Sequence, residues 1–167
     1  YVTEIGKGVT GFAEGDLVGL VPTIPCLRCY YCQHGMEHLC TDSLIVGYRV
    51  NGGLADFIKI PREAVDRKCV FKAAEHLTAA EVSLAEPLGC VLNGASQYQT
   101  KIGDVVLILA AGHIGLLHAQ LNKQMGASKV IVSDPSAGRR EIATSLGATH
   151  TVDPPQTDLS AFVSELT

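Results

Sequence analysis

The sequence predicts two architectures in one chain: a β-rich segment over residues 1–90, then the first half of a doubly wound parallel sheet over residues 91–167. Three observations predict this division. Short apolar runs separated by Gly and Pro fill the first part, a dense cysteine cluster interrupts them, and buried strands alternate with helical patterns after about residue 100. We therefore expect an α/β domain preceded by a β domain.

Composition limits the classes of function. Of the 167 residues, 47% are hydrophobic and 18% charged, which is enough apolar material for a core. A net charge of −4 without any Lys/Arg block argues against a nucleic-acid partner. No apolar run approaches the ~20 residues that span a bilayer, and no signal-peptide pattern is present. With six cysteines, these features favour a reducing compartment, the cytoplasm, and no membrane association.

Three stretches of the first part have strand-like patterns. Residues 1–5 alternate in polarity, residues 17–21 follow a Gly15-Asp16 turn, and residues 54–60 follow a glycine pair and end at Pro61. The chain thus begins inside a strand pattern, and its last residues resemble an unfinished helix. We expect it to be a piece of a longer protein.

One helix start is predicted before the division. Thr78 with Glu81 three residues later forms a capping-box pattern, so a helix is expected to begin there. Pro87 is expected to end or kink it, because proline lacks the amide hydrogen that a helix interior needs. Residues 62–77 are ambiguous.

The second part has the pattern of a βαβαβ unit. The run 105–109 is continuously apolar, as in a strand buried on both faces, and 129–134 has the same character. Between them, apolar residues recur at helical spacing until Gly126, and a second helical pattern ends at Gly147. Residues 150–153 are expected to form a third strand.

Four cysteines lie within 15 residues, separated by two, two and seven residues: Cys26, Cys29, Cys32 and Cys40. Paired C-x-x-C spacing lets sulfurs converge on one ion, and four thiolates complete the closed tetrahedral shell of a structural zinc site. The alternative is an iron–sulfur cluster, but a ferredoxin run closes after three residues and a proline. The segment has no helix or strand periodicity and is expected to be a loop shaped by its metal.

The other cysteines and the histidines carry weaker signals. Cys69 and Cys90 stand alone and are expected to pack as small apolar groups. His34 and His38 lie inside the cysteine segment and are expected to face solvent, since four thiolates already fill a tetrahedron. His76, His118 and His150 have no evident partner.

The turn after the first buried strand resembles a dinucleotide fingerprint. Gly112 would let the backbone approach a pyrophosphate, and Gly115 would let the helix pack against the strand. Ala110 replaces the first glycine, which is tolerable if its φ is negative. His113 would place an imidazole near the phosphates, and Asp134 follows at the end of the next strand, where a carboxylate accepts ribose hydroxyls.

Asp134 also predicts the cofactor. Its carboxylate would repel the 2′-phosphate of NADP, and the nearest basic residue, Arg139, comes one helical turn later, so we predict NAD over NADP. The alternative is that Asp134 only caps the following helix.

Together these motifs resemble the zinc-dependent medium-chain dehydrogenase family over essentially the whole chain. The resemblance rests on the cysteine segment, the Gly52-Gly53-x-Ala55-Asp56-Phe57 stretch, Glu86-Pro87-Leu88, and the A-x-G-H-I-G turn with Asp134. Glu86-Pro87, where the classical alcohol dehydrogenases have a cysteine, is similar to the polyol branch, which includes sorbitol-type and threonine dehydrogenases. Asn93 departs from that branch, which often has His there.

The resemblance implies a partial GroES-like catalytic domain, then a partial NAD-binding Rossmann domain. It implies that Cys26, Cys29, Cys32 and Cys40 hold a structural zinc, and that Glu86 is a ligand of a second, catalytic zinc. Gly112, His113, Ile114 and Gly115 would line the pyrophosphate, and Asp134 and Arg139 would face the adenosine ribose. The implied reaction is NAD-dependent oxidation of a secondary alcohol or polyol, in a homo-oligomer.

The resemblance also implies missing parts. The family's other catalytic-zinc ligands, a Cys and a His-Glu pair, lie upstream of Tyr1. A catalytic zinc needs three protein ligands, so this chain alone is expected to be inactive, and no catalytic residue is assigned. The alternative is a non-enzymatic zinc- and nucleotide-binding remnant or interaction module.

Overall fold

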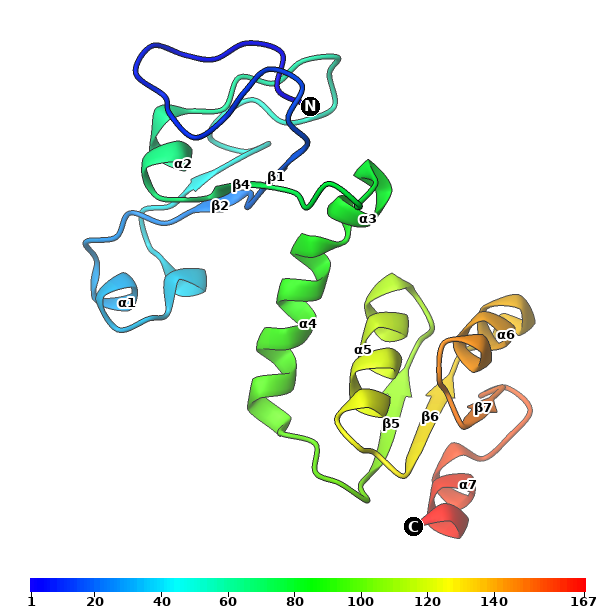
Figure 1. Cartoon of the computed structure of the whole chain (residues 1–167). Helices are drawn as coiled ribbons and strands as arrows, with labels where there is room; N and C mark the ends of the chain where they lie inside the picture. Colours follow the sequence, from blue (N-terminus) through cyan, green and yellow to red (C-terminus); the bar gives the residue numbers. More distant parts are fainter. The chain divides into compact units, whose positions relative to one another are not determined.

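The computed structural model describes residues 1–167, which form two compact units, Tyr1–Glu86 and Pro87–Thr167. Figure 1 shows the order of their elements along the chain. The predicted boundary at residue 90 lies inside helix α4 (Ala85–Tyr98). None of the helices has both the length and the apolar character that a membrane crossing requires.

Two short antiparallel strand pairs organise the first unit. Strand β1 (Val18–Leu20) pairs with β4 (Val70–Lys72), and β2 (Thr23–Ile24) pairs with β3 (Leu44–Ile45). Helix α2 (Arg62–Asp66) lies in the stretch that the sequence left ambiguous. The core cluster consists of Ile24, Ala64 and Cys69, so the prediction that Cys69 packs as an apolar group is confirmed.

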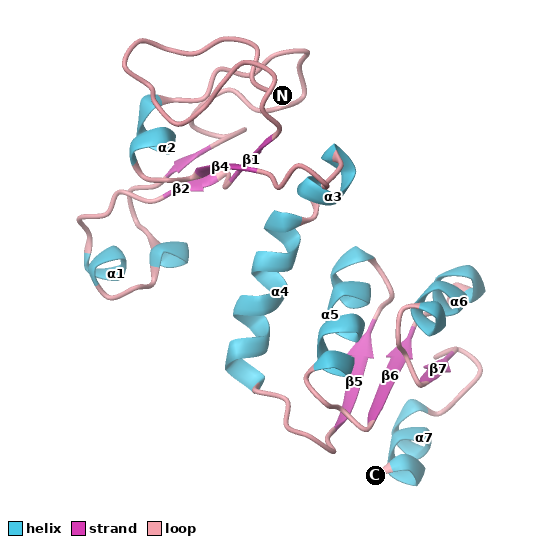
Figure 2. Ribbon diagram, in the orientation of Figure 1, coloured by secondary structure: helices cyan, strands magenta, loops and turns pink.

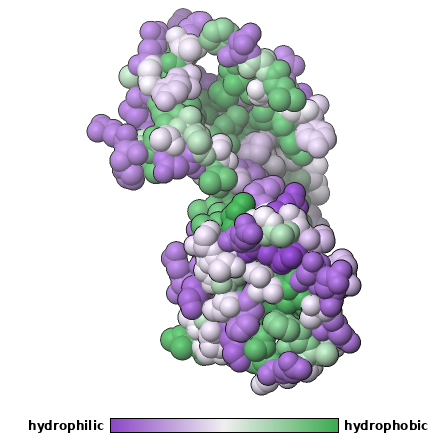
Figure 3. Space-filling view, turned by 90° about the vertical axis from the view of Figure 1, so that its right-hand side faces the viewer, coloured by the Kyte–Doolittle hydropathy of each residue, from purple (hydrophilic) through white to green (hydrophobic).

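Two predicted strands of this unit do not form. Residues 1–5 contain no strand; Val2 instead exchanges backbone hydrogen bonds with the loop at Gly15 and Asp16. Residues 54–60 pair with no strand, and the side chains of Leu54 and Phe57 are exposed. An alternating pattern becomes a strand only where another strand accepts its hydrogen bonds, and no strand lies beside these segments. Apolar residues consequently reach the surface in several places (Figure 3).

The helix start at Thr78 is confirmed, and this helix is interrupted at Leu84, shortly before Pro87, as predicted. Helix α3 (Ala79–Ser83) begins with a complete capping box, in which Thr78 and Glu81 exchange hydrogen bonds. Pro87 lies in the first turn of the next helix, α4, which begins at Ala85. The first turn of a helix needs no amide donor and suits the fixed φ of proline.

The second unit is the predicted half of a doubly wound sheet. Parallel strands β5 (Val105–Leu109), β6 (Lys129–Ser133) and β7 (His150–Val152) lie in that order. Helices α5 (His113–Gln124), α6 (Ala137–Ser145) and α7 (Leu159–Leu166) follow the strands in turn (Figure 2). The chain is thus a β segment followed by the first half of a doubly wound parallel sheet, as the sequence predicts.

The strands of this sheet differ in burial. Val130, Ile131 and Val132 of β6 are fully buried, as expected for the central strand. Strand β5 is an edge strand, and Leu107 and Leu109 are 39% and 69% exposed, so the prediction that both of its faces are buried is wrong. Its covered side packs Ile108 into the core with Ala119 of α5, while the side that carries Leu107 and Leu109 remains open.

Candidate metal centre and nucleotide-binding turn

The cysteine segment is held between paired strands. Strand β2 leads into it and β3 follows it, and their antiparallel pairing brings the two ends of the segment together. Within it, helix α1 (Tyr30–Gln33) carries Cys32, and a 3₁₀ turn, η1 (Glu37–Leu39), precedes Cys40. The expectation of a plain loop is therefore wrong, because single helical turns are too short to give a periodic sequence pattern.

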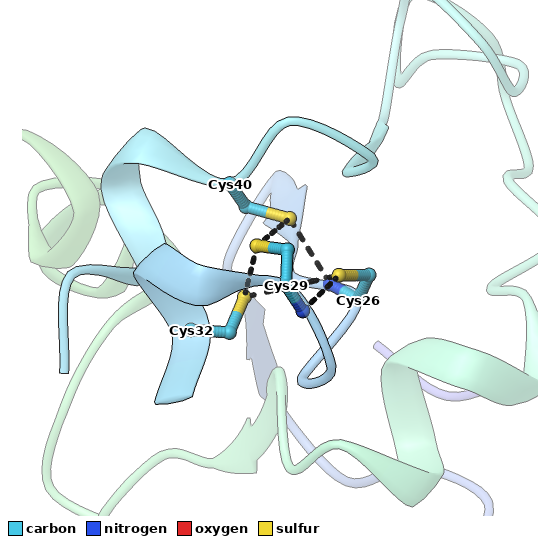
Figure 4. Close-up of side chains that lie close together, drawn as sticks. All are labelled: Cys26, Cys29, Cys32 and Cys40. Atoms are coloured by element: carbon cyan, nitrogen blue, oxygen red, sulfur yellow. Dashed lines mark hydrogen bonds between the residues drawn. The ribbon is translucent and has the colours of Figure 1, made fainter. Parts of the chain in front are cut away.

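The four cysteine sulfurs converge on one point (Figure 4). Three Sγ–Sγ distances are 3.5 Å (Cys29–Cys32), 4.0 Å (Cys26–Cys32) and 4.0 Å (Cys29–Cys40), and all four sulfurs lie within 4.8 Å of one another. Zinc–sulfur bonds of ~2.3 Å in a tetrahedron place the sulfurs about 3.8 Å apart. The donor set and its dimensions therefore fit zinc.

The surroundings of the cluster shift the pKa values of its thiols in opposite directions. Backbone amides of Cys32 and Thr41 lower the pKa of Cys29 to about 6, whereas burial raises the pKa of Cys32 to about 12. The amide of Cys26 donates to Cys40 Sγ at 3.2 Å, as amides around thiolate ligands do. A divalent cation favours the thiolate form of all four groups.

His34 and Cys90 do not belong to this cluster. The ring of His34 stacks on Tyr30 at 4.1 Å, and its Nδ1 donates to the Tyr30 carbonyl, so this side chain is exposed and turned to its own helix, as expected. Cys90 is an exposed residue of α4, so the prediction that it packs as a core group is wrong.

Glu86 lies in the first turn of α4, outside the cysteine cluster. It is among the residues that line a cavity of about 460 Å³, whose walls include β1, Phe71 and Val82. The cysteine cluster is the one group of three or more His, Cys, Asp or Glu side chains that converge. The role of Glu86 as a metal ligand therefore stays a prediction.

The turn after β5 is built on a strained alanine. Ala110 has φ +78°, in the left-handed region that favours glycine, so the condition of a negative φ is not met. The turn nevertheless forms, because the amide of Ala110 donates a hydrogen bond to the Ser133 carbonyl of β6, and this bond holds Ala110 in place.

The two fingerprint glycines have different surroundings. A Cβ on Gly115 would lie deep inside the van der Waals radius of the Ala110 carbonyl oxygen, so the helix passes the turn at a distance that only glycine permits. A Cβ on Gly112 would meet nothing within 4 Å. Gly112 precedes His113, the first residue of α5, and makes no side-chain cap. The helix therefore presents its unpaired first amides to an open side, as anion-binding helix starts do.

Asp134 joins the turn to the end of β6. Asp134 is 2% exposed, and its carboxylate accepts two amide hydrogen bonds, both of 2.8 Å, from Ala111 and Ser136. These two amides lower its pKa. The bond to Ser136 closes a short turn ahead of α6, whose N-cap residue is Ser136, so Asp134 does not cap that helix. The bond to Ala111, which the sequence did not suggest, holds the glycine turn after β5.

Two arginines of α6 lie beside this carboxylate. Arg139 is exposed, with Nη1 3.9 Å from Asp134 Oδ2. Arg140 donates to the Asp134 backbone carbonyl at 2.7 Å and pairs with Asp153 at 3.3 Å. Arg140, which the sequence did not single out, thus ties the ends of β6 and β7 together, and Arg139 remains exposed near the predicted ribose site.

Two family models match the chain. Residues 1–70 match an alcohol dehydrogenase GroES-like domain, and residues 114–167 match a zinc-binding dehydrogenase domain. L-threonine 3-dehydrogenase of Pyrococcus horikoshii is 34% identical over 99% of this chain and 46% of that protein. The chain spans about half the length of the curated relatives it matches.

Solved structures agree with these matches. A structure described as that of a zinc-binding dehydrogenase from Sinorhizobium meliloti 1021, bound to NADP, is 37% identical with a TM-score of 0.86, over 95% of this chain and 45% of that one. Galactitol-1-phosphate dehydrogenase from Escherichia coli is 30% identical with a TM-score of 0.85, over 99% of this chain and 46% of that one.

The fold and the matches define a chain with a GroES-like segment followed by a Rossmann-like sheet, the two parts that the matched dehydrogenase models describe. The chain belongs to the zinc-dependent medium-chain dehydrogenase family.

Proposed function

We propose that this chain is part of an oxidoreductase that transfers a hydride between a secondary alcohol or polyol and NAD, with a structural zinc in the cysteine segment. The observation that carries the proposal is the Asp134 carboxylate hydrogen-bonded to the turn that opens α5. A carboxylate beside a glycine turn at a helix start is the arrangement that binds a ribose next to a pyrophosphate. The relatives named above, a threonine and a galactitol-1-phosphate dehydrogenase, support an alcohol substrate.

In this proposal the cysteine segment holds zinc without taking part in the reaction. Four thiolates leave no coordination position for a substrate, so Cys26, Cys29, Cys32 and Cys40 would stabilise the fold of the first unit. We expect elemental analysis to find one zinc ion per chain. A preparation with the visible absorption of an iron–sulfur cluster would contradict this assignment.

In the second unit, Gly112, His113, Ile114 and Gly115 would receive the pyrophosphate. Asp134 and Arg139 would bind the adenosine ribose: each Asp134 oxygen accepts one amide and retains a lone pair for a ribose hydroxyl. The same carboxylate disfavours a 2′-phosphate, so the proposal keeps NAD as the cofactor, although one similar structure contains NADP. Exposed Arg139 is the residue that would weaken this preference.

Titration of the chain with NADH and NADPH, followed by nicotinamide fluorescence, tests the nucleotide site. We expect NADH to bind at least tenfold more tightly than NADPH, and the Gly112→Ala variant to lose NADH binding while keeping its stability, because the new methyl group fills the open side of the turn and touches nothing else. Gly138→Ala, also in open space but on α6, is the matched control and should bind normally. Absence of binding to either nucleotide would overturn the proposal.

The catalytic part of the proposal concerns the whole protein. A catalytic zinc, when bound, would act as a Lewis acid on the alcohol oxygen. Glu86, which is among the residues that line the cavity described above, is the one residue of this chain proposed to contribute to such a site. Because one carboxylate does not hold a catalytic zinc, we expect no alcohol oxidation by the isolated chain.

The alternative function is a non-enzymatic one, either a zinc- and nucleotide-binding remnant or an interaction module. The observation that favours it is the open edge of β5, whose exposed Leu107 and Leu109 suit contact with another chain. NADH titration distinguishes these functions in part, because a dehydrogenase chain must bind NADH and an interaction module need not.

A further inference from the structure

An ion pair joins the two ends of the cysteine segment. Nη2 of Arg28 donates to Oδ2 of Asp42 at 2.7 Å. Arg28 lies in the first C-x-x-C turn, between Cys26 and Cys29, and Asp42 comes two residues after Cys40. Figure 4 shows Cys40 approaching the other sulfurs from its own stretch of ribbon. The ion pair therefore links the same two stretches of chain that a bound metal ion would link.

Asp42 also faces two further arginines. Nη1 of Arg49 lies 3.6 Å from Asp42 Oδ1. The hydrogen bond and the charge of Arg28 lower the pKa of Asp42 most, and the charges of Arg49 and Arg67 lower it further. The carboxylate is thus surrounded by several cations, and an ion pair within such a network is better ordered than an isolated one.

The paired strands on their own fix this end of the segment only as far as β3. Ile24 of β2 pairs with Leu44 of β3, which comes four residues after Cys40. The bond from Arg28 to Asp42 fixes a point only two residues after Cys40. It thereby halves the length of chain that connects the fourth sulfur to a fixed point. A shorter connection raises the local concentration of a group at the place to which it returns.

The position of this pair matters more than its strength. The side chains of Arg28 and Asp42 are 79% and 53% exposed, and exposed ion pairs add little to folding stability. Release of a metal ion from four thiolates proceeds one sulfur at a time, however, so a weak contact can decide how often the first sulfur returns. Cys40 is half-buried and follows the longest gap between the four cysteines, so it is the sulfur that separates most easily.

We propose that the Arg28–Asp42 ion pair slows the release of zinc by keeping the Cys40 thiolate within reach of the ion. This inference rests on the zinc assignment made above. The expected effect is about threefold, because doubling the length of the connection lowers the probability of return by about that factor. Arg28 and Asp42 are thus positioning residues for the fourth sulfur and not ligands themselves.

A purely electrostatic role would give a different pattern. Four thiolates outweigh the charge of one zinc ion, so the occupied cluster is anionic. Asp42 raises the pKa of Arg28, and the Cys26 sulfur raises it less strongly, so the guanidinium also interacts with the cluster. If Arg28 acted only through its charge, its removal would speed zinc release and removal of the Asp42 carboxylate would slow it. In the role proposed here, both removals speed release.

The experiment measures transfer of zinc from the full 167-residue chain to an excess of the chelator pyridylazoresorcinol, followed by absorbance. Each protein is first loaded with zinc, and its metal content is determined by elemental analysis. We expect Arg28→Met and Asp42→Ala each to release zinc about threefold faster than the parent chain. The double variant should be no faster than either single variant, because both changes remove the same contact. Arg62→Met removes a comparably exposed pair with Asp66 on α2 and, as the matched control, should release zinc at the parent rate.

Two results would overturn the inference while leaving the zinc assignment intact. One is an Asp42→Ala variant that releases zinc no faster than the parent chain, and the other is a double variant whose effect is the product of the two single effects. A parent chain that takes up no zinc would instead refute the zinc assignment, and the inference with it.

Ionic strength supplies the second measurement. Raising the salt concentration from about 0.05 M to about 0.5 M should bring the parent rate close to that of the double variant, because screening weakens an exposed ion pair. A rate difference between these two proteins that salt leaves unchanged would also contradict the proposal.

Discussion

Gly115 lies against the carbonyl of Ala110, closer than any residue with a side chain could approach. This contact places the start of α5 directly over the turn that leaves β5, so the helix amides and the turn face the same open side. The geometry depends on both positions: Gly115 permits the approach, and Ala110 supplies the carbonyl from a left-handed conformation. The nucleotide site proposed here rests on this contact.

Gly115→Ala is expected to destabilise the second unit by about 1–3 kcal/mol, because the added methyl group must push the helix away from the turn. NADH affinity should fall with it, since the first amides of α5 move. Urea unfolding and NADH titration measure the two effects. Gly138→Ala, in the first turn of α6 with open space around it, should instead raise stability by about 0.5 kcal/mol. Equal stability of the two variants would contradict the close contact.

Ala110→Gly is expected to stabilise the chain by about 1 kcal/mol. Alanine at φ +78° has a steric cost that glycine lacks, which outweighs the greater freedom that glycine gives the unfolded chain. Chemical unfolding at pH 7 measures the change. Ala111→Gly is the matched control: Ala111 is 2% exposed and has no positive φ, so this variant should be less stable than the parent chain. A destabilised Ala110→Gly would show that the methyl group contributes packing.

Asp134→Asn is expected to weaken the turn after β5 and to reduce the pH dependence of the folding stability. An asparagine oxygen can accept from Ala111 or from Ser136, but its amide nitrogen cannot accept from the other. We expect roughly a tenfold loss in the folding equilibrium constant at pH 7, with a larger loss of NADH affinity. Equilibrium unfolding and NADH titration measure these losses.

The folding stability of the parent chain and that of Asp134→Asn should also depend differently on pH in the acidic range. The amides lower the pKa of Asp134 in the folded state, so its contribution is complete above the ordinary value of 3.8 and is lost as the pH falls through the folded-state pKa. The free energy of unfolding of Asp134→Asn should lack this pH-dependent contribution. Asp56→Asn, at an exposed loop position, should keep the acid profile of the parent chain. Identical acid profiles in all three proteins would refute the role given to Asp134.

Cys40→Ser is expected to release the zinc and loosen the first unit. Cys40 closes the tetrahedron and accepts the Cys26 amide, and a serine oxygen is a poor substitute for a thiolate ligand. Elemental analysis should find less than a tenth of the parent zinc content, and hydrogen exchange should speed up in residues 23–45. NADH affinity should stay within about twofold, because the nucleotide turn lies in the other compact unit. Cys90→Ser, outside the cluster, should keep its zinc.

Much of the site could be predicted because its signals are local in the sequence. The spacing of Cys26, Cys29, Cys32 and Cys40 keeps their sulfurs near one another, because short chain segments connect them. Paired C-x-x-C spacing of this kind is typical of a metal site, and the four sulfurs do converge. The strand, turn and helix around Gly112 also follow from neighbouring residues, because the apolar run, the glycines and the helical period lie within a few turns of one another.

Features that depend on distant partners could not be predicted. Residues 54–60 have the composition of a strand, yet without a neighbouring strand they form none. The bond from Ala111 to Asp134 and the contact of Tyr98 with His118 join residues more than 19 positions apart. The periodicity of the sequence carries no information about such pairs. Pro87 fits both a helix end and a first turn, and only the start of α4 at Ala85 distinguishes them.

The sequence by itself determined the two architectures, the four-thiol cluster and the position of the nucleotide turn, because short-range spacing and periodicity specify them. The tertiary structure alone decided the left-handed φ of Ala110, the burial of Asp134 between two amides and the contact of Tyr98 with His118. Each of these depends on hydrogen-bond partners and packing that the fold brings together, and such contacts leave no local pattern in the chain.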